Sequence, residues 1–287
     1  MNISRGPGQA PKYQRLAADL RRRIMGGEWQ GGTPLPVESE LENQYGVARN
    51  TVRLAVDVLV NEGLLVRVQG KGTYLKDHPV LDHHAYRAPS DPELGSPGTS
   101  LRSAFAAYAE EAAAAGRKLT SDFQMLIVRA TTDITDRLRI EPGEAVVLRR
   151  MLRYMDGEPW SVEESHYPVG LAASTALMAP DPVVGGDEMA LADAGYLETG
   201  CVDELCARMP NPEEAQWFQA GPGVPLLVQL RTGYTESGPV RVTETRYSAD
   251  RNRLIYSLGS LGGLDAPSVR SAEVFSEIGD LGAPAEI

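Results

Sequence analysis

The chain has 287 residues, of which 42% are hydrophobic and 23% are charged, the proportions of an ordinary folded protein with one or two domains. No apolar run approaches the roughly 20 residues that a membrane span requires, and the N-terminus lacks the apolar core of a secretory signal. Two cysteines, Cys201 and Cys206, are too few for a disulfide framework. The composition excludes a membrane protein and indicates the reducing cytoplasm.

The net charge of −11 is divided unevenly along the chain. Residues 1–76 hold 11 Lys and Arg against 7 Asp and Glu, a net charge of +4, whereas residues 77–287 carry −15. A basic segment can bind a polyanion on an acidic chain, because affinity depends on local cations that displace counterions. The charge balance is therefore compatible with nucleic-acid binding by the N-terminal part.

Two helices are predicted near the N-terminus. Residues 1–11 are rich in Gly and Pro, and we expect them to be disordered. Apolar residues at helical spacing predict a helix over 13–25. Within 38–45, Leu41 and Tyr45 lie one turn apart, which predicts a short helix that ends at the following glycine.

A third helix is predicted over 48–63, followed by a small hairpin. The helix carries one apolar stripe, and its opposite face carries Arg49, Asn50, Arg53 and Asp57. Alternating residues then predict two short strands joined at Gly70, Lys71 and Gly72, with Thr73 opening the return strand. The apolar stripe consists of Val52, Ala55, Val56, Leu59 and Val60.

A short helix, a Gly-containing turn and a second helix with a basic leading end form a helix-turn-helix pattern. Such a second helix fits the major groove of duplex DNA, where its first residues reach base edges and phosphates. Lys71 between two glycines can approach a phosphate backbone closely. The alternative interpretation is a small three-helix bundle with a hairpin and no DNA role.

The segment from Tyr13 to Leu75 resembles the winged helix-turn-helix of the GntR superfamily of bacterial transcription regulators, through YQRLAADLRRRI, LPVESEL, GVARNTVRLAVDVLVNEGLL and GKGTYL. The sequence departs from the family where Ser39 replaces an Arg and Ala48 replaces a Ser helix cap. The resemblance and the polar helix face together predict these DNA-binding residues: Ser39, Arg49, Asn50, Thr51, Arg53, Gly70, Lys71, Gly72 and Thr73.

A linker is predicted over 77–100, which is dense in Pro, Ser, Gly and Asp. His78, His83 and His84 lie there beside Asp82, but without a second ligand cluster we expect solvated side chains and no metal. Three predicted regions precede the second domain: a disordered start (1–11), a winged helix-turn-helix (12–76) and this linker. The second domain is predicted over 101–258.

The second domain is predicted to be α+β, with a mainly antiparallel sheet. Two long hairpins over 146–168 and 225–250 look like duplicates, since each has an Arg-containing strand, a Gly turn and a return strand with Glu and Tyr. Shorter patterns predict a strand over 122–130 and helices over 100–116, 134–140, 189–196 and 211–220.

With SLRSAF and AAAGRKL, this order resembles the effector-binding domain called UTRA, which marks the HutC branch of the GntR superfamily and has a chorismate-lyase-like fold. The resemblance runs from about Thr99 to Leu258, and residues 259–287 form an extension that it does not assign.

The resemblance implies an effector site on the first hairpin. Alternation places Arg149, Met151 and Arg153 on one strand face. In the resembling domain an Arg pair here grips an anionic effector, often a phosphosugar, but Met151 stands at one of the two positions. The alternative is a set of ion pairs on a solvated face, such as Arg153 with Glu163. The predicted effector-binding residues are Thr99, Ser100, Arg149, Arg153, Glu163, Tyr167, Glu244 and Tyr247.

These patterns predict a homodimeric regulator, most often a repressor in this branch, that binds a near-palindromic double-stranded DNA operator and responds to an effector. No nucleophile elbow, phosphate loop or zinc signature indicates an enzyme, and no cofactor is implied. Two alternatives stay open: a repressor whose second domain only dimerises, and a lyase or hydrolase on the same fold. The sequence names neither the effector nor the operator.

Overall fold

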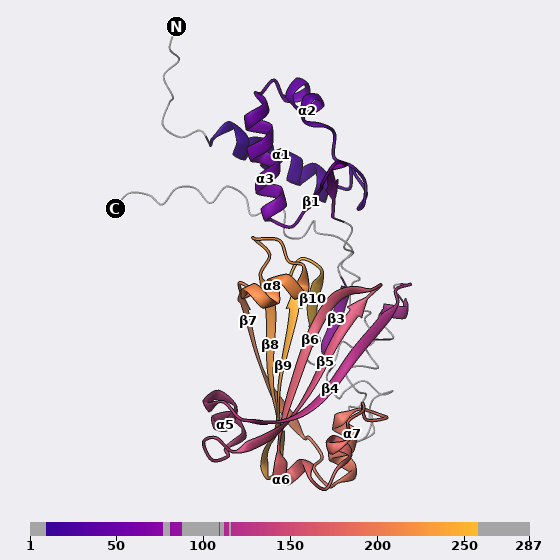
Figure 1. The fold of residues 1–287 in the computed structure, drawn as a ribbon, viewed down its shortest axis with the longest axis vertical. Coiled ribbons are helices and arrows are strands. Elements are labelled where there is room, and N and C mark those ends of the chain that lie inside the picture. Colours follow the sequence, from indigo (N-terminus) through magenta and orange to yellow (C-terminus); the bar gives the residue numbers. More distant parts are fainter. Residues whose placement is uncertain (1–9, 77–80, 88–108, 110–111, 115, 258–287) are drawn as a thin grey trace, which may run out of the picture. The chain divides into compact units, whose positions relative to one another are not determined.

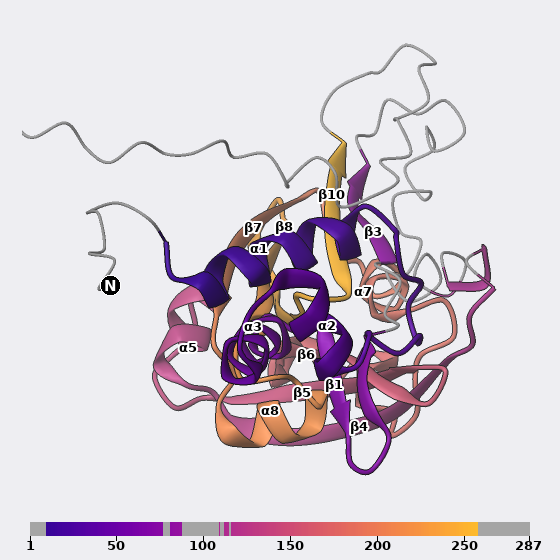
Figure 2. The ribbon, with the colours of Figure 1, turned by 90° about the horizontal axis from the view of Figure 1, so that it is seen from above.

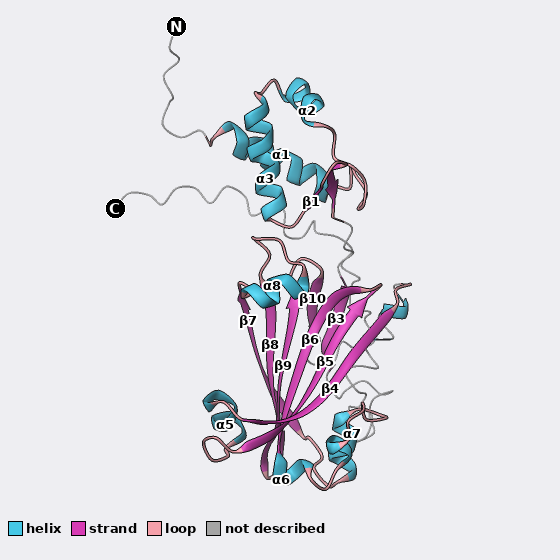
Figure 3. Cartoon of the chain, viewed as in Figure 1, coloured by secondary structure: helices cyan, strands magenta, loops and turns pink. Residues whose placement is uncertain are grey.

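The computed structural model describes residues 10–76, 81–87, 109, 112–114 and 116–257. The chain divides into two compact units: of the described residues, the first unit holds 10–76 with 221–223, and the second holds the rest. The first unit is mainly helical and the second mainly β-strand (Figures 1 and 3). The predicted helix over 100–116 and the C-terminal extension fall largely or wholly outside the described residues.

The first unit has three helices followed by a hairpin. The helices are α1 (Lys12–Met25), α2 (Glu38–Tyr45) and α3 (Arg49–Asn61), and β1 (Leu65–Val68) pairs antiparallel with β2 (Gly72–Leu75). These bounds confirm the predicted elements. The helices and strands share one core, formed by Leu16, Ala17, Leu20, Leu35, Leu41, Val52, Ala55, Val56, Leu59, Leu65 and Leu75.

The turn between α2 and α3 depends on local backbone chemistry. Gly46 ends α2 in the left-handed region, with φ of 61°, where a side chain would be strained. Ala48 is the N-cap of α3 and its side chain makes no capping hydrogen bond. The predicted departure from a Ser cap therefore leaves the start of α3 without side-chain capping.

The second unit is built on one six-stranded antiparallel sheet, in the order β4-β5-β6-β9-β8-β7. The predicted antiparallel sheet is therefore confirmed, and so are both long hairpins. Its strands are β4 (Leu119–Arg129), β5 (Ala145–Met155), β6 (Glu158–Pro168), β7 (Gly200–Arg208), β8 (Leu226–Thr235) and β9 (Gly238–Ser248).

The duplication extends beyond the hairpins. Strand β4, helix α5 (Thr132–Leu138) and the β5–β6 hairpin repeat as β7, helix α8 (Pro212–Phe218) and the β8–β9 hairpin. Arg139 and Gln219, 80 residues apart, both end their helices in the left-handed conformation. Strands β6 and β9 meet at the centre, where Glu164 lies opposite Glu244, again 80 residues apart. Equivalent residues of the two repeats are therefore 80 positions apart in the chain.

Helices cover both faces of this sheet. On one face α5 and α8 pack through Ile134, Leu138 and Phe218. On the opposite face, α6 (Val169–Ala172), the 3-10 helix η2 (Ala176–Met178) and α7 (Asp187–Asp193) pack against Val147 and Tyr167. This second face, hereafter the α7 face, holds the candidate site.

The structure corrects the expectation of a linker over 77–100. Residues Leu81–Arg87 form β3, which pairs in parallel with β10 (Asn252–Ser257), and the two strands lie side by side in Figure 2. His83 is buried, its Nε2 lies 2.7 Å from Asn252 Oδ1, and its ring stacks on Tyr247. The expectation of a solvated side chain is therefore wrong for His83. Local sequence patterns could not predict its burial, because its partner lies about 170 residues further along the chain.

Candidate functional site

The leading end of α3 presents the predicted polar residues to solvent. Arg49, Asn50 and Arg53 are exposed, and Thr51 is half-buried. The apolar side of the same helix is buried in the core of the first unit, which fixes the direction in which these side chains project. A helix held in this way, with its first turn bare, has the form that enters a DNA major groove.

Arg49 is partly neutralised by α2. Its Nε donates to Glu38 Oε2 at 2.8 Å, and this hydrogen bond raises the pKa of the Arg49 guanidinium. The Arg49 and Glu38 side chains remain 74% and 37% exposed, so the pair can exchange with a phosphate. Ser39 is exposed beside it, and α2 carries three Glu and no basic residue. The part of this surface that belongs to α2 is therefore more acidic than the part that belongs to α3.

The hairpin turn supplies the second half of the surface. Gly70 and Gly72 adopt φ of 75° and 121°, conformations that disfavour other residues. Lys71 between them is exposed, and Thr73 is half-buried at the start of β2. The structure therefore places all nine predicted DNA-binding positions at the start of α2, the start of α3 or the hairpin turn.

A cavity of about 150 Å³ lies on the α7 face of the second unit. Four predicted effector residues line it: Arg149 and Arg153 from β5, and Glu163 and Tyr167 from β6. The predicted alternation is correct, since Met151 lines the same wall. Ser165 of β6 also lines it. Further walls come from β4, β9, the segment before α7 and the first turn of α7, through Ser121, Phe123, Arg241, Pro182, Val183, Gly186, Asp187 and Glu188.

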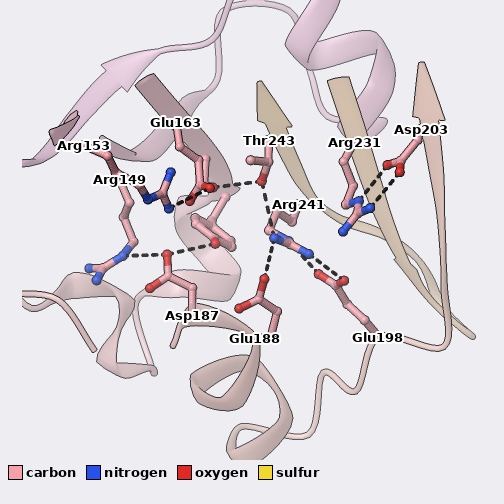
Figure 4. Close-up of polar contacts among 12 residues, drawn as sticks. Arg149, Arg153, Glu163, Asp187, Glu188, Glu198, Asp203, Arg231, Arg241 and Thr243 are labelled. Carbon is pink, nitrogen blue, oxygen red and sulfur yellow. Dashed lines mark hydrogen bonds and ion pairs between the residues drawn. The ribbon is translucent and has the colours of Figure 1, made fainter. Parts of the chain in front are cut away.

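Arg149 and Tyr167 converge on one carboxylate at the start of α7. Arg149 Nε and the Tyr167 hydroxyl both donate to Asp187 Oδ2, at 2.9 and 3.0 Å (Figure 4). The Arg149 guanidinium also lies over the Phe123 ring, 4.5 Å from its centroid. Burial raises the pKa of the Tyr167 hydroxyl well above its ordinary value, so this group is a hydrogen-bond donor at neutral pH.

Arg153 and Glu163 form the cross-strand ion pair that was the alternative interpretation. Arg153 Nη2 donates to Glu163 Oε2 at 2.9 Å. The side chains are 3% and 25% exposed, so the pair lies in the cavity wall and not on a solvated face. Arg153 and Glu163 therefore form an ion pair and line the cavity at the same time.

The structure does not bring Glu244 to this cavity. Glu244 stands opposite Glu164 on the central strand pair, one residue out of register with Glu163, and it contacts Arg246 at 3.2 Å. Because side chains alternate along a strand, that one-residue difference puts Glu244 on the opposite face. The expected match between Glu244 and Glu163 is wrong in register, and the repeat partner of Glu163 is Thr243.

Tyr247 also stands apart from the cavity wall. Tyr247 lies on the α7 face, but it packs with Trp160 and stacks on His83. Burial raises its pKa to about 12. Thr99 and Ser100 lie outside the described residues.

Sequence reasoning missed three charged residues of the wall: Asp187, Glu188 and Arg241. The first two belong to the first turn of a short helix, where acidic residues are commonly explained by the helix dipole. Arg241 shares its strand face with Thr243 and Thr245, and this parity was the only signal in the sequence that could have indicated it.

Among the described residues, no group of three or more His, Cys, Asp or Glu side chains is placed to hold a metal ion. Over the same residues, no helix combines the length and the apolar character that crossing a bilayer demands.

A bare basic helix with a glycine hairpin, in a chain whose second unit holds a polar cavity, defines a class: DNA-binding transcription regulators with a separate ligand-binding domain. Comparison with known proteins agrees. Residues 12–75 match the family of bacterial regulatory proteins called gntR, and residues 114–253 match the UTRA domain.

Similar proteins extend over most of the chain. It is 28% identical to the mannosyl-D-glycerate transport/metabolism system repressor MngR of Escherichia coli (strain K12), over 81% of this chain and 89% of MngR. It is 26% identical to the HTH-type transcriptional repressor NagR of Bacillus subtilis (strain 168), over 91% of this chain and all of NagR. A crystal structure assigned to the GntR family has 28% identity and a TM-score of 0.59, and covers 87% of this chain and 98% of that one.

The chain belongs to the GntR family of transcription regulators, with a UTRA effector-binding domain in the arrangement of the HutC branch. The predicted family and fold class are thereby confirmed.

Proposed function

We propose that this protein is a homodimeric repressor that binds a near-palindromic operator and releases it when a small effector binds the second domain. The observation that carries the proposal is the exposed leading end of α3, where Arg49 and Arg53 project from a helix fixed in its own core. Those residues would contact guanine edges and phosphates in the major groove. Lys71 on the hairpin would contact the backbone or the minor groove.

Repression is supported by the names of two relatives, MngR and NagR, which are both described as repressors. Dimerisation is supported by geometry of the DNA itself, because a single winged domain reads only one half-site and two half-sites lie about one helical turn apart, or a multiple of it. Action on DNA places the protein in the cytoplasm.

The effector would act by changing the relative populations of the DNA-competent and DNA-free arrangements. A ligand in the cavity on the α7 face changes DNA affinity only as far as it binds the DNA-competent and DNA-free arrangements with different affinity. Four of the effector contacts predicted from the sequence line this cavity: Arg149, Arg153, Glu163 and Tyr167.

The test uses a palindromic DNA fragment from upstream of the gene in a fluorescence anisotropy titration. Arg49→Ala and Arg53→Ala should each weaken binding by roughly tenfold or more, the discrimination expected of a lost guanine or phosphate contact. Arg129→Ala, which removes an exposed arginine from β4 of the second unit, is the matched control and should bind as wild type. Unchanged binding by both recognition-helix variants would disprove the proposal.

A further inference from the structure

The arginines of the cavity on the α7 face are already committed to partners inside the protein. Arg149 donates from Nε to Asp187, from Nη1 to the carbonyl oxygens of Leu177 and Ala179, and from Nη2 to that of Asp181. It is 3% exposed. Arg149 therefore ties the segment before α7 to strand β5, and its charge is balanced by Asp187.

Arg241 is balanced twice. Its Nε and Nη2 donate to the two oxygens of Glu198 at 2.8 and 2.9 Å, and its Nη1 donates to Glu188 at 2.8 Å (Figure 4). Burial disfavours the charge of Arg241, but the two neighbouring carboxylates outweigh it and raise the pKa. Arg153 is balanced by Glu163. A bound anion would meet three guanidinium groups whose charges are already compensated.

The carboxylates of the wall keep acceptor capacity. Asp187 uses Oδ2, Glu188 uses Oε1 and Glu163 uses Oε2 for their arginines. Within the described part of the chain, the second oxygen of each carboxylate makes no hydrogen bond to another residue. None of these three second oxygens is among the fully buried atoms that lack a hydrogen-bond partner. An ionised carboxylate can accept several hydrogen bonds, so each offers a ligand a charged acceptor.

The number of charged residues around the cavity also favours a cationic ligand over an anionic one. Three arginines and three carboxylates line the cavity, and Glu198 adds a fourth carboxylate behind Arg241. Residues 116–257, which hold the cavity, contain 14 Lys and Arg against 21 Asp and Glu, a net charge of −7 that favours cations over anions nearby. Burial raises the pKa of Glu188, although the neighbouring Arg241 acts to lower it.

We infer that the cavity binds a small donor-rich ligand without net negative charge, above all one with a protonated amino group, and that phosphorylated ligands are excluded. An ammonium group would lie against the free oxygens of Glu163, Asp187 and Glu188, and hydroxyl groups would bond Ser165 and Ser121. Met151 and Phe123 would contact its carbon atoms. This inference rests on the proposed effector role of the cavity and narrows the chemistry of the effector.

The experiment measures binding to the full-length protein with small probes that differ in charge. The probes are glucosamine and ethanolamine as amines, glucose and glycerol as neutral polyols, and inorganic phosphate, lactate and glucose 6-phosphate as anions. Thermal unfolding is followed first, and each probe that raises the midpoint is then titrated by calorimetry. The variants are Glu163→Gln and Glu188→Gln, with Glu158→Gln, an exposed residue of β6, as the matched control.

The expected result is that an amine binds, that anions do not, and that each cavity variant weakens the amine by about tenfold or more, as loss of a charged hydrogen bond predicts. The control should bind the amine as wild type does. The Glu163 side chain is 25% exposed, against 18% for Glu188, so Glu163→Gln keeps the test valid if Glu188→Gln fails to fold.

Three results would overturn the inference: binding of an anion in preference to the amines, amine binding that both cavity variants leave unchanged, or no binding of any amine or polyol. Operator binding is measured on the same preparations. Intact operator binding combined with any of these results rejects the inference alone, whereas failure of the operator titration rejects the proposed function.

Discussion

At the scale of single residues, the pairing of Arg49 with Glu38 sets how strongly the recognition helix attracts DNA. Both side chains are substantially exposed, so the pair contributes little to stability. It nevertheless places a negative charge beside a cation that a phosphate would contact, and α2 has no basic residue to compensate.

Glu38→Gln should therefore raise operator affinity, by about two- to tenfold at low salt, because Arg49 is released and one like charge no longer repels the phosphates. Anisotropy titrations at two salt concentrations would measure this. Glu28→Gln removes an equal charge that pairs with Arg23 and not with Arg49, and it should have a smaller effect. A decrease in affinity for Glu38→Gln would show that Glu38 orients Arg49 and does not compete with DNA.

At the scale of elements, the start of α3 lacks a side-chain cap. Ala48→Ser should stabilise the first unit by about 1 kcal/mol, since a Ser hydroxyl can accept a hydrogen bond from a free backbone N–H of the first turn. Urea unfolding would measure it. Ala18→Ser is the control, because the same change at an exposed position inside α1 should destabilise by about 0.5 kcal/mol. Equal effects of the two substitutions would contradict the capping argument.

A second prediction at this scale concerns α8. Glu214 accepts from Arg208 at 2.6 and 2.7 Å and from Arg246 at 3.1 Å, and these arginines, Arg208 above all, lower its pKa to about 2. Its side chain also accepts from the N–H of the N-cap Asn211. Glu214 thus joins α8 to β7 and β9.

Because the folded-state pKa of Glu214 lies below the unfolded value of about 4.3, its contribution to stability is complete above that value and is lost as the pH falls toward 2. Glu214→Gln should lower the free energy of unfolding near pH 7 by up to about 3 kcal/mol. The difference from wild type should shrink between pH 5 and pH 2 in urea titrations. A difference independent of pH would assign the loss to helix capping alone.

At the scale of the whole molecule, the basic segment 1–76 is followed by an acidic remainder of the chain. For a dimer that contacts about 6–10 phosphates, affinity should fall by about 10³- to 10⁵-fold between 50 and 200 mM salt. Arg53→Ala should reduce the slope of log affinity against log salt by about 2, one phosphate contact for each subunit of the dimer. The slope from anisotropy titrations checks this, and an unchanged slope would assign Arg53 to base contacts only.

Local patterns in the sequence determined much of this protein. The end of α2, with Leu41 and Tyr45 one turn apart and a glycine after them, depends on residues a few positions apart, and so does the apolar stripe of α3. The same holds for the strand alternation that puts Arg149 and Arg153 on one face of β5. The two hairpins were predictable for the same reason, since each joins strands across a short turn.

Only the tertiary structure decided what depends on distant pairing. Strand β3 exists because β10 lies beside it, and Glu244 is turned away from Glu163 because the central strands pair in one register. The segment before α7 brings Asp187 and Glu188 to arginines of β5 and β9, where they neutralise the charges expected to hold an anion. Periodicity reports which face a side chain occupies along its own strand, but the partner across the fold is set by packing of segments far apart in the chain.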